Sequence, residues 1–266
     1  MLVSAADNDG ASSLSSNPSA IVTTQTVTGN DGQSNNGSAS GAGAANGTPA
    51  SETATLHLKA GKATHCSYNK HALKVIRCSY TKRAITLEGA LTTSLGQPIG
   101  GATLQVLQQV TGSTTTTLLN QIKTSPNGTF TATIPAGPSR RIKIAYRAYT
   151  ADPAYAATGS VVESVEAGVE LHVNNHYTSP TGTVVFKGRV TGAIPPLGAI
   201  VDLLVKYHGQ WVTIRTPRTE HDGNFHITYQ WQGSTGSYAF LVEIPAGQAN
   251  YPYTNGHSNT INITST

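Results

Sequence analysis

Charged side chains are scarce in this chain of 266 residues. Asp, Glu, Lys and Arg together make up 11% of it, whereas about 25% is usual for a soluble globular protein. The chain has one Met and four Phe, and no apolar run approaches the roughly 20 residues that span a bilayer. Its solubility therefore depends on hydroxyl groups, amides and exposed backbone. This composition is typical of an exported β protein and unlike that of a cytosolic enzyme.

Catalytic motifs are also missing. The chain has no GxSxG elbow, no HExxH motif and no glycine-rich phosphate loop. Glycoside cleavage would need two facing carboxylates. Glu163, Glu166 and Glu170 would share a face only on a helix, but the Val-rich segment that holds them predicts a strand with an exposed charged face. We therefore expect no enzymatic activity, no cofactor and no metal site.

The first 53 residues are low in sequence complexity. Of these residues, 38 are Ser, Thr, Gly, Asn or Ala, and none is aromatic. Such a segment cannot bury enough apolar surface to offset the conformational entropy that ordering would cost. We therefore predict a disordered tail over residues 1–53. The tail carries four acids and no base.

A basic segment follows this tail. Residues 54–266 hold nine of the 13 acids and all 17 bases of the chain. Between Glu52 and Glu88 no acid occurs, and the bases there are Lys59, Lys62, Lys70, Lys74, Arg77, Lys82 and Arg83. Such a cluster attracts polyanions. Cell-wall polysaccharide or another anionic surface is the partner it suggests, a solvated strand surface is the simpler interpretation, and no nucleic acid partner is expected.

Both cysteines, Cys66 and Cys78, lie in this segment, each within a Cys-Ser-Tyr triplet. An even number of cysteines in an exported chain predicts a disulfide, which would contribute on the order of 3 kcal/mol for a loop of about a dozen residues. Two free thiols in a reducing compartment are the alternative. The neighbouring histidines match no standard zinc spacing. We interpret residues 54–83 as a basic hairpin stapled by its cysteines.

From residue 84 onward, apolar residues such as Ile85, Leu87 and Leu91 alternate with polar or small ones, as in half-buried strands. Turn residues such as Pro126-Asn127-Gly128 separate the strands. Further strands are predicted at 102–108, 115–123, 129–134, 141–148 and 161–173. No stretch shows a sustained helical period. Short strands with regular turns predict a β-sandwich.

The second half of the chain repeats the first. Gly89 corresponds to Gly188, the pair Leu104 and Val106 to Val201 and Leu203, and the run 124–130 to the run 219–225. In both runs a glycine suited to positive φ is followed two residues later by a Phe. We therefore predict an all-β fold with two tandem Ig-like antiparallel sandwiches, 84–173 and 184–266, joined by 174–183.

A family resemblance supports this architecture. The phrase Gly96-Gln-Pro-Ile-Gly-Gly-Ala-Thr-Leu-Gln-Val106 resembles the GxPLxGAxVxV signature of carboxypeptidase-regulatory-like domains and related bacterial Ig-like surface repeats. The second half resembles the closing domain of many large secreted bacterial proteins. Its matching residues are Phe186–Val190, Ile194–Pro196, Trp211, Thr219, Asp222–Phe225, Tyr251–Tyr253 and Gly256–Ser258. The resemblance covers residues 84–266 and implies a spacer or display module of an exported protein.

Aromatic residues are the candidates for ligand contacts, because sugar and peptide sites are commonly built on exposed rings. Trp231, Tyr251 and Tyr253 are the better candidates for exposure and are therefore the candidate contacts. The alternative, which is the commoner outcome for a loop tyrosine, is packing against the end of the sandwich. Tyr207 and Tyr229 fall on inward positions of the repeat and are expected in the core. Trp211 matches a position of the resembling family and is expected there too.

Together these features predict a non-enzymatic structural or surface-display protein, a spacer or adhesive module, located outside the cell or on its surface. The alternatives are a carbohydrate-binding accessory module and the non-catalytic C-terminal part of a larger secreted enzyme. No signal peptide is visible at Met1-Leu2-Val3. The expected location therefore rests on composition and on the resemblance.

Overall fold

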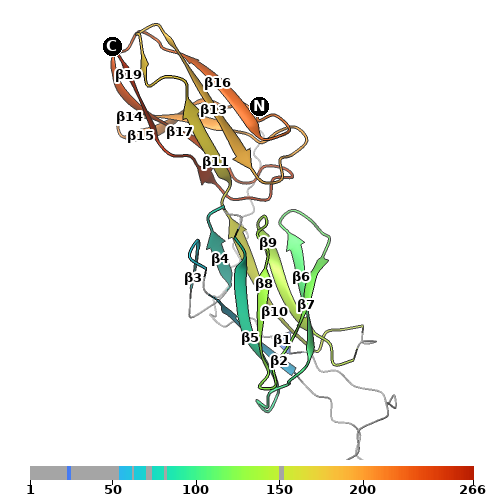
Figure 1. The fold of residues 1–266 in the computed structure, drawn as a ribbon. Helices are drawn as coiled ribbons and strands as arrows, with labels where there is room; N and C mark the ends of the chain where they lie inside the picture. Colours follow the sequence, from blue (N-terminus) through green and yellow to red (C-terminus); the bar gives the residue numbers. More distant parts are fainter. Residues whose placement is uncertain (1–22, 25–53, 62, 70–73, 81–82, 150–152) are drawn as a thin grey trace, which may run out of the picture.

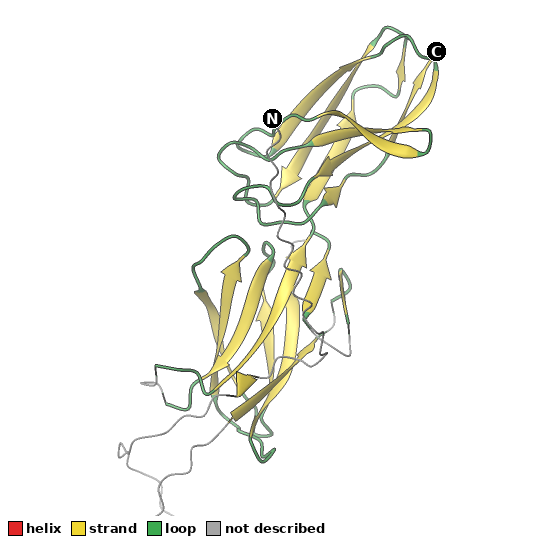
Figure 2. Ribbon diagram, turned by 180° about the vertical axis from the view of Figure 1, so that it is seen from behind, coloured by secondary structure: helices red, strands yellow, loops and turns green. Residues whose placement is uncertain are grey.

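The computed structural model describes residues 23–24, 54–61, 63–69, 74–80, 83–149 and 153–266. These residues form two β-sandwiches that follow one another along a common long axis (Figures 1 and 2). The described residues contain no helix that could cross a membrane. The predicted all-β, Ig-like fold is confirmed. The tail predicted at 1–53 lies outside the described residues, except for Thr23–Thr24.

The first sandwich packs a large sheet against a sheet of three strands. The small sheet has the order β2 (Ala54–Ala60), β5 (Ile85–Thr93) and β8 (Thr129–Ile134). The large sheet has the order β3 (Cys66–Tyr68), β4 (Val75–Cys78), β10 (Ala157–Val165), β9 (Arg140–Tyr146), β6 (Thr103–Val110) and β7 (Thr117–Lys123), with β1 (Thr23–Thr24) also paired to β10.

The second sandwich repeats this arrangement. Its small sheet has the order β11 (Gly168–Val173), β13 (Thr183–Thr191) and β16 (Asn224–Gln230). Its large sheet has the order β12 (Tyr177–Thr178), β19 (Ile261–Ser265), β17 (Gly236–Ile244), β14 (Asp202–Tyr207) and β15 (Gln210–Arg215), with β18 (Gly256–His257) on β17. Strand pairs are antiparallel except β4 with β10 and β12 with β19.

The sequence repeat coincides with repeated close packing between the strands of each small sheet. A Cβ atom on Gly89 would lie 2.2 Å from the backbone oxygen of His57 and 2.4 Å from Cζ of Phe130. A Cβ atom on Gly188 would lie 2.1 Å from the backbone oxygen of Glu170 and 2.4 Å from Cζ of Phe225. Each glycine therefore leaves room for the Phe ring of the neighbouring strand.

A repeated side-chain hydrogen bond holds the turn before β8 in the first sandwich and the turn before β16 in the second. The Ala102 N–H donates to Oγ1 of Thr124 over 2.9 Å, and the Ala199 N–H donates to Oγ1 of Thr219 over 3.0 Å. Both threonines are buried. These hydroxyls satisfy backbone groups that would otherwise lack a partner inside the protein.

The sheets group some strands differently from the expected domain ranges. β2 pairs with β5 and β4 with β10, so the strands of segment 54–83 belong to the first sandwich. β11, expected to end the first domain, pairs with β13 in the second. Only Glu166 and Ala167 separate β10 from β11. Neither link residue is Gly or Pro, so the boundary lacks the cluster of turn residues that marks a loop in sequence.

Candidate interaction surfaces and the domain junction

Trp231 was expected to be exposed, but it is only 4% exposed, so that expectation is wrong. Its ring packs edge-on against Tyr229 and Tyr238, with centroids 5.6 and 5.5 Å away. The indole N–H donates to the Ser234 carbonyl over 2.7 Å. Trp231 follows directly after β16, and its ring joins the core cluster of the sandwich. Burying a large ring while pairing its N–H is the usual arrangement for Trp.

Tyr251 and Tyr253 were also expected to be exposed, and they are 3% and 7% exposed. Their ring centroids lie 4.8 Å apart, and the ring of Tyr80 from the first sandwich lies 6.0 Å from that of Tyr253. The Tyr251 hydroxyl donates to the Thr191 carbonyl over 3.1 Å. Burial raises the pKa of both tyrosines above the ordinary value of 10. The expectation that these tyrosines are exposed is therefore wrong and the alternative, packing of the loop at the end of the sandwich, is correct, with the neighbouring sandwich helping to cover the loop.

The opposite correction applies to Tyr207 and Trp211, which were expected in the core but are 57% and 38% exposed. Both lie at the turn end of the β14–β15 hairpin, where β15 is the edge strand of the large sheet. Lys206 stands opposite Trp211 in the hairpin, and its Nζ lies 5.9 Å from the Trp211 ring centroid. Tyr229, the third ring expected inside, packs against the core while remaining half-buried.

The bases predicted as polyanion contacts are divided between different parts of the first sandwich. Lys59 stands on the small sheet directly opposite Glu88, whereas Arg77 stands on β4 of the large sheet. Lys74 and Arg83 are exposed residues of the loops before β4 and β5. Three further bases, Lys62, Lys70 and Lys82, lie outside the described residues. The strands of this segment belong to two sheets, so the described bases do not form one surface.

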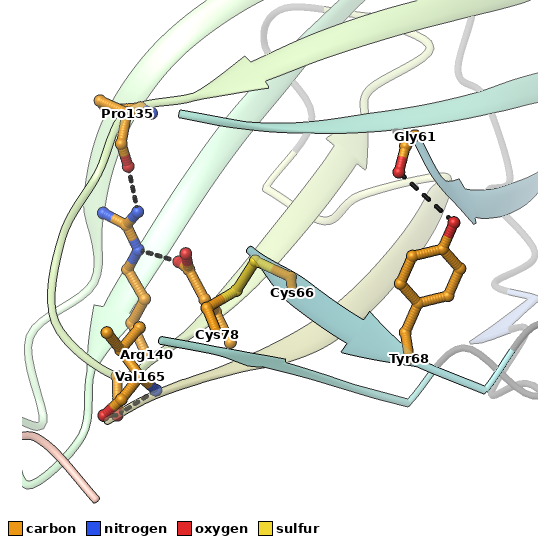
Figure 3. Close-up of a disulfide and its surroundings, with 9 residues drawn as sticks. Gly61, Cys66, Tyr68, Cys78, Pro135, Arg140 and Val165 are labelled. Carbon is orange, nitrogen blue, oxygen red and sulfur yellow. Dashed lines mark hydrogen bonds and ion pairs between the residues drawn. A yellow bond between two sulfur atoms is a disulfide. The ribbon is translucent and has the colours of Figure 1, made fainter. Parts of the chain in front are cut away.

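Cys66 and Cys78 form the predicted disulfide (Figure 3). They stand directly opposite each other on the antiparallel strands β3 and β4. His65 brings a ring nitrogen within 4.8 Å of both sulfur atoms. Metal ions bind cysteine as a thiolate, and sulfur atoms joined in a disulfide are not thiolates. In this oxidised state the pair acts as a staple at the edge of the large sheet.

Glu163, expected on an exposed face, is buried at 3% exposure beside Arg140 at 2%, so that expectation is wrong. Nε of Arg140 donates to Oε2 of Glu163 over 2.7 Å, and Nη1 donates to Oε1 of Gln108 over 2.8 Å. Nη2 donates to the carbonyl of Pro135 (Figure 3). Burial raises the pKa of the Glu163 carboxyl, although the charge of Arg140 acts in the opposite direction.

The other two acids of this run do not join Glu163. Glu166 is in the two-residue link between the sandwiches, and Glu170 is exposed on β11 of the second sandwich. The expectation that residues 161–173 are extended strand is met by β10 and β11. The three carboxylates are therefore distributed over two domains, and they do not form the facing pair that glycoside cleavage requires.

Backbone hydrogen bonds tie the two sandwiches together beside the link. The Thr254 N–H donates to the Val165 carbonyl over 2.8 Å, and the Ala167 N–H donates to the Thr254 carbonyl over 3.0 Å. The Ser139 N–H donates to the Pro252 carbonyl over 2.8 Å. Next to these bonds a cleft of about 830 Å³ is lined by the 110–113 loop and β10 of the first sandwich and by the 246–254 loop of the second.

No protein-family model and no curated protein matches this chain. Among solved structures, the adhesin InvE of Yersinia pseudotuberculosis is 12% identical over 79% of this chain and 58% of its own, with a TM-score of 0.35. Invasin, a bacterial integrin-binding protein, is 12% identical over 80% and 39%, with a TM-score of 0.34. The D0–D1 domain of intimin is 12% identical over 78% and 97%, with a TM-score of 0.28. We draw no functional conclusion from similarities this low.

Proposed function

We propose that this chain is an extracellular structural or surface-display protein, a non-enzymatic spacer whose two sandwiches move as one stiff unit. The junction is the observation that supports this proposal. Relative motion is the usual expectation for linked domains with a modest interface. Here the link has two residues, and the loop around Thr254 is hydrogen-bonded to both the last strand and the link of the first sandwich.

Buried tyrosines add an apolar contact to these hydrogen bonds. Tyr253 reaches from the second sandwich to Tyr80 of the first. A Cβ atom on Gly192 would lie 2.6 Å from the Tyr253 ring, and one on Gly168 would lie 2.6 Å from the Tyr80 ring. Glycines at these two positions therefore leave space for rings that bridge the domains. Bending at the junction would expose these rings and break the backbone bonds together, which favours a single orientation.

The location outside the cell is supported by the disulfide and by the composition. Disulfides persist in oxidising compartments and are rare in reducing ones. Cys66–Cys78 pins the edge of the large sheet. A spacer on a cell surface must resist proteases and local unfolding, and a stapled edge strand serves that need because an open edge is a weak point of a sheet.

Nuclear magnetic relaxation of the full chain tests the stiff-spacer proposal. We expect the amides of both sandwiches to fit one elongated rotational diffusion tensor. We expect a Tyr253→Ala variant to weaken the correlated tumbling of the two sandwiches, whereas a matched Tyr207→Ala variant, which removes an exposed ring, leaves the single tensor unchanged. Independent tumbling of the sandwiches in the unmodified protein would contradict the proposal.

A second variant keeps the test valid if Tyr253→Ala unfolds the second sandwich. Six Gly and Ser residues inserted between Glu166 and Ala167 lengthen the link and leave the Tyr253 side chain in place. If the junction contacts hold the domains, this insertion reduces the correlated tumbling only in part, because the tyrosines and the Ser139–Pro252 bond still join the sandwiches. Complete decoupling by the insertion would show that the short link alone aligns the domains.

A further inference from the structure

The outer face of the large sheet in the first sandwich is basic. Lys143 on β9 stands opposite Ser160 on β10, and Arg141 stands opposite Val162. On the neighbouring strands, Ser164 stands opposite Arg77 and Thr103 opposite Lys123. Directly opposed residues point to the same face of a sheet. Four bases therefore share the solvent face of this sheet, which we name the basic face: Arg77, Lys123, Arg141 and Lys143.

Inward residues confirm this assignment of faces. Ile76, Ile142 and Ile144 alternate with the bases along β4 and β9, and all three are buried in the core. Side chains on a strand point alternately to opposite faces. Arg77, Arg141 and Lys143 must therefore point outward.

No acid stands among the strand positions of the basic face. The remaining positions on this side of the strands are Ser, Thr, Gln, Val, Leu and Ala. Glu163, the acid of β10, points inward to Arg140. Within the described part of the chain, Arg77, Lys123 and Arg141 form no ion pair. The positive charge of this face is therefore not compensated by neighbouring strand residues.

The spacing of the bases suits an extended polymer. Arg141 and Lys143 are two residues apart on one strand, a distance of about 7 Å along it. Arg77 lies two strands away, about 10 Å across the sheet. Hydroxyls and amides such as those of Ser160, Ser164 and Gln121 lie between the bases. A flat face with separated charges and interspersed hydrogen-bonding groups can contact a chain that carries anionic groups and hydroxyls at intervals.

Tyr155 is the aromatic ring at this face, and cations already occupy it. Nζ of Lys143 lies 4.8 Å from its ring centroid, and the Arg147 guanidinium carbon lies 4.5 Å from it. The Tyr155 hydroxyl donates to Oε1 of Gln105 over 3.0 Å. Proteins that bind single-stranded nucleic acid stack bases on free aromatic rings. Tyr155 is therefore not free to stack on a base, which favours a polysaccharide over a nucleic acid.

We propose that the basic face of the first sandwich binds an acidic polysaccharide through its carboxylate, sulfate or phosphate groups. This surface differs from the segment predicted in sequence, with which it shares only Arg77. The inference does not depend on the spacer function, because a flexible pair of domains could carry the same face.

Two matched triple variants of the full chain test the proposal, with polygalacturonate as the probe. Lys123→Gln/Arg141→Gln/Lys143→Gln removes three of the four charges of the basic face, and Lys59→Gln/Lys74→Gln/Arg83→Gln removes three charges of the sequence-predicted segment outside that face. Both remove three positive charges. At low salt we expect the first variant to weaken binding on the order of 100-fold, at about fivefold for each base near an anionic surface. The second should weaken it by less than about fivefold.

The other outcomes overturn the proposal. Equal losses in the two variants would show that net charge alone attracts the polymer, and a larger loss in the second would place the contact in the segment. Absence of binding by the unmodified protein also contradicts the proposal. Tighter binding of an oligo-dT strand than of polygalacturonate with the same number of charges would indicate a nucleic acid surface. Circular dichroism and hydrogen exchange of the first sandwich check that both variants are folded.

Discussion

The two sandwiches share a backbone plan but fill the same interior positions with opposite chemistry. Val106 stands opposite Ile144 in the first, and Leu203 opposite Val242 in the second, which aligns the two large sheets. In this alignment the buried polar cluster of the first sandwich corresponds to apolar positions of the second: Gln108 to Val205, Arg140 to Tyr238 and Glu163 to Ile263. The fold therefore accommodates a buried ion pair at these positions, where each nitrogen of Arg140 donates a hydrogen bond.

The outer faces differ as well. Arg141 and Lys143 of the first sandwich correspond to Ala239 and Leu241 of the second. Gln105 and Ala145 correspond to Asp202 and Glu243. The same strand positions are basic in one domain and apolar or acidic in the other. Surface charge can therefore vary between the repeats without changing the core.

The free edges of the large sheets differ in a third way. In the first sandwich the edge beside β10 is covered by β4 and β3, joined by the disulfide. In the second, the equivalent edge of β19 is covered by β12, which has two residues. A strand edge with unpaired backbone groups invites pairing with other chains. The first sandwich has the better protected edge, and the difference predicts unequal sensitivity to reducing conditions.

The largest expected effect comes from breaking the polar cluster. Arg140→Met removes the partner of a buried carboxylate and the donors to Gln108 and Pro135. We expect it to lower the free energy of unfolding of the first sandwich by about 3 kcal/mol. Hydrogen exchange resolved by mass spectrometry measures this, because it reports each sandwich separately. The exchange of the second sandwich away from the junction should not change.

A double variant sharpens this test. Arg140→Met/Glu163→Leu gives the first sandwich an apolar pair, like Tyr238 and Ile263 in the second. Replacing both members of a buried ion pair with apolar residues is commonly neutral or stabilising. The double variant should therefore recover most of the stability lost in Arg140→Met. If both variants are equally destabilised, packing around Arg140 and not its charge accounts for the loss.

Removing the disulfide should have the next largest effect. Cys66→Ser/Cys78→Ser opens a loop between residues 12 apart, and the chain-entropy model predicts a loss of about 3 kcal/mol or slightly less. The loss should be confined to the first sandwich. The two Trp residues of the chain are both in the second, so denaturant unfolding followed by tryptophan fluorescence should be unchanged. A matching shift in fluorescence would mean that the two sandwiches unfold as one unit.

The repeat, the turns and the disulfide could be predicted from sequence because each depends on local or paired signals. Gly128 and Gly223 adopt positive φ in equivalent turns, as Asn-Gly and Asp-Gly indicate. The disulfide followed from an even cysteine count in a chain with an exported composition. The exposure of Trp231, Tyr251 and Tyr253 could not be predicted in the same way. For the two tyrosines it depends on a ring that is distant in sequence, Tyr80 at the domain junction. For Trp231 it depends on how the nearby rings of Tyr229 and Tyr238 are arranged in space.

The charged residues show the same limit. Glu163 is buried because Arg140, 23 residues earlier, lies beside it. The alternation of Arg141 and Lys143 with buried isoleucines was a usable signal for part of the basic face. The contributions of Arg77 and Lys123 required the strand order of the sheet, since these bases are separated by long stretches of sequence. Counting the bases of one segment therefore could not identify the set of bases that shares this face.

A smaller effect is expected at the repeated glycines, where the two sandwiches should behave alike. Gly89→Ala and Gly188→Ala each place a Cβ atom against a backbone oxygen and a Phe ring. We expect each to lower the unfolding free energy of its own sandwich by about 2 kcal/mol, as overpacking does. Hydrogen exchange of the two variants measures both. A loss at only one position would show that the shared glycine has different packing roles in the repeats.

The smallest expected effect is a pH dependence confined to the first sandwich. Burial raises the pKa of Glu163 above its ordinary 4.5 more strongly than Arg140 lowers it. Between that ordinary value and the raised one, the folded carboxyl keeps a proton that the unfolded chain has lost, so stability rises as pH falls through this window. The Glu163→Gln variant lacks the carboxyl group, so its unfolding free energy should not show this part of the pH dependence. The measurement is the difference in unfolding free energy between the two proteins from pH 7 to pH 4.5. A difference of opposite sign would mean that the 2.7 Å ion pair with Arg140 outweighs burial, in which case the polar cluster would stabilise the first sandwich as a charged pair.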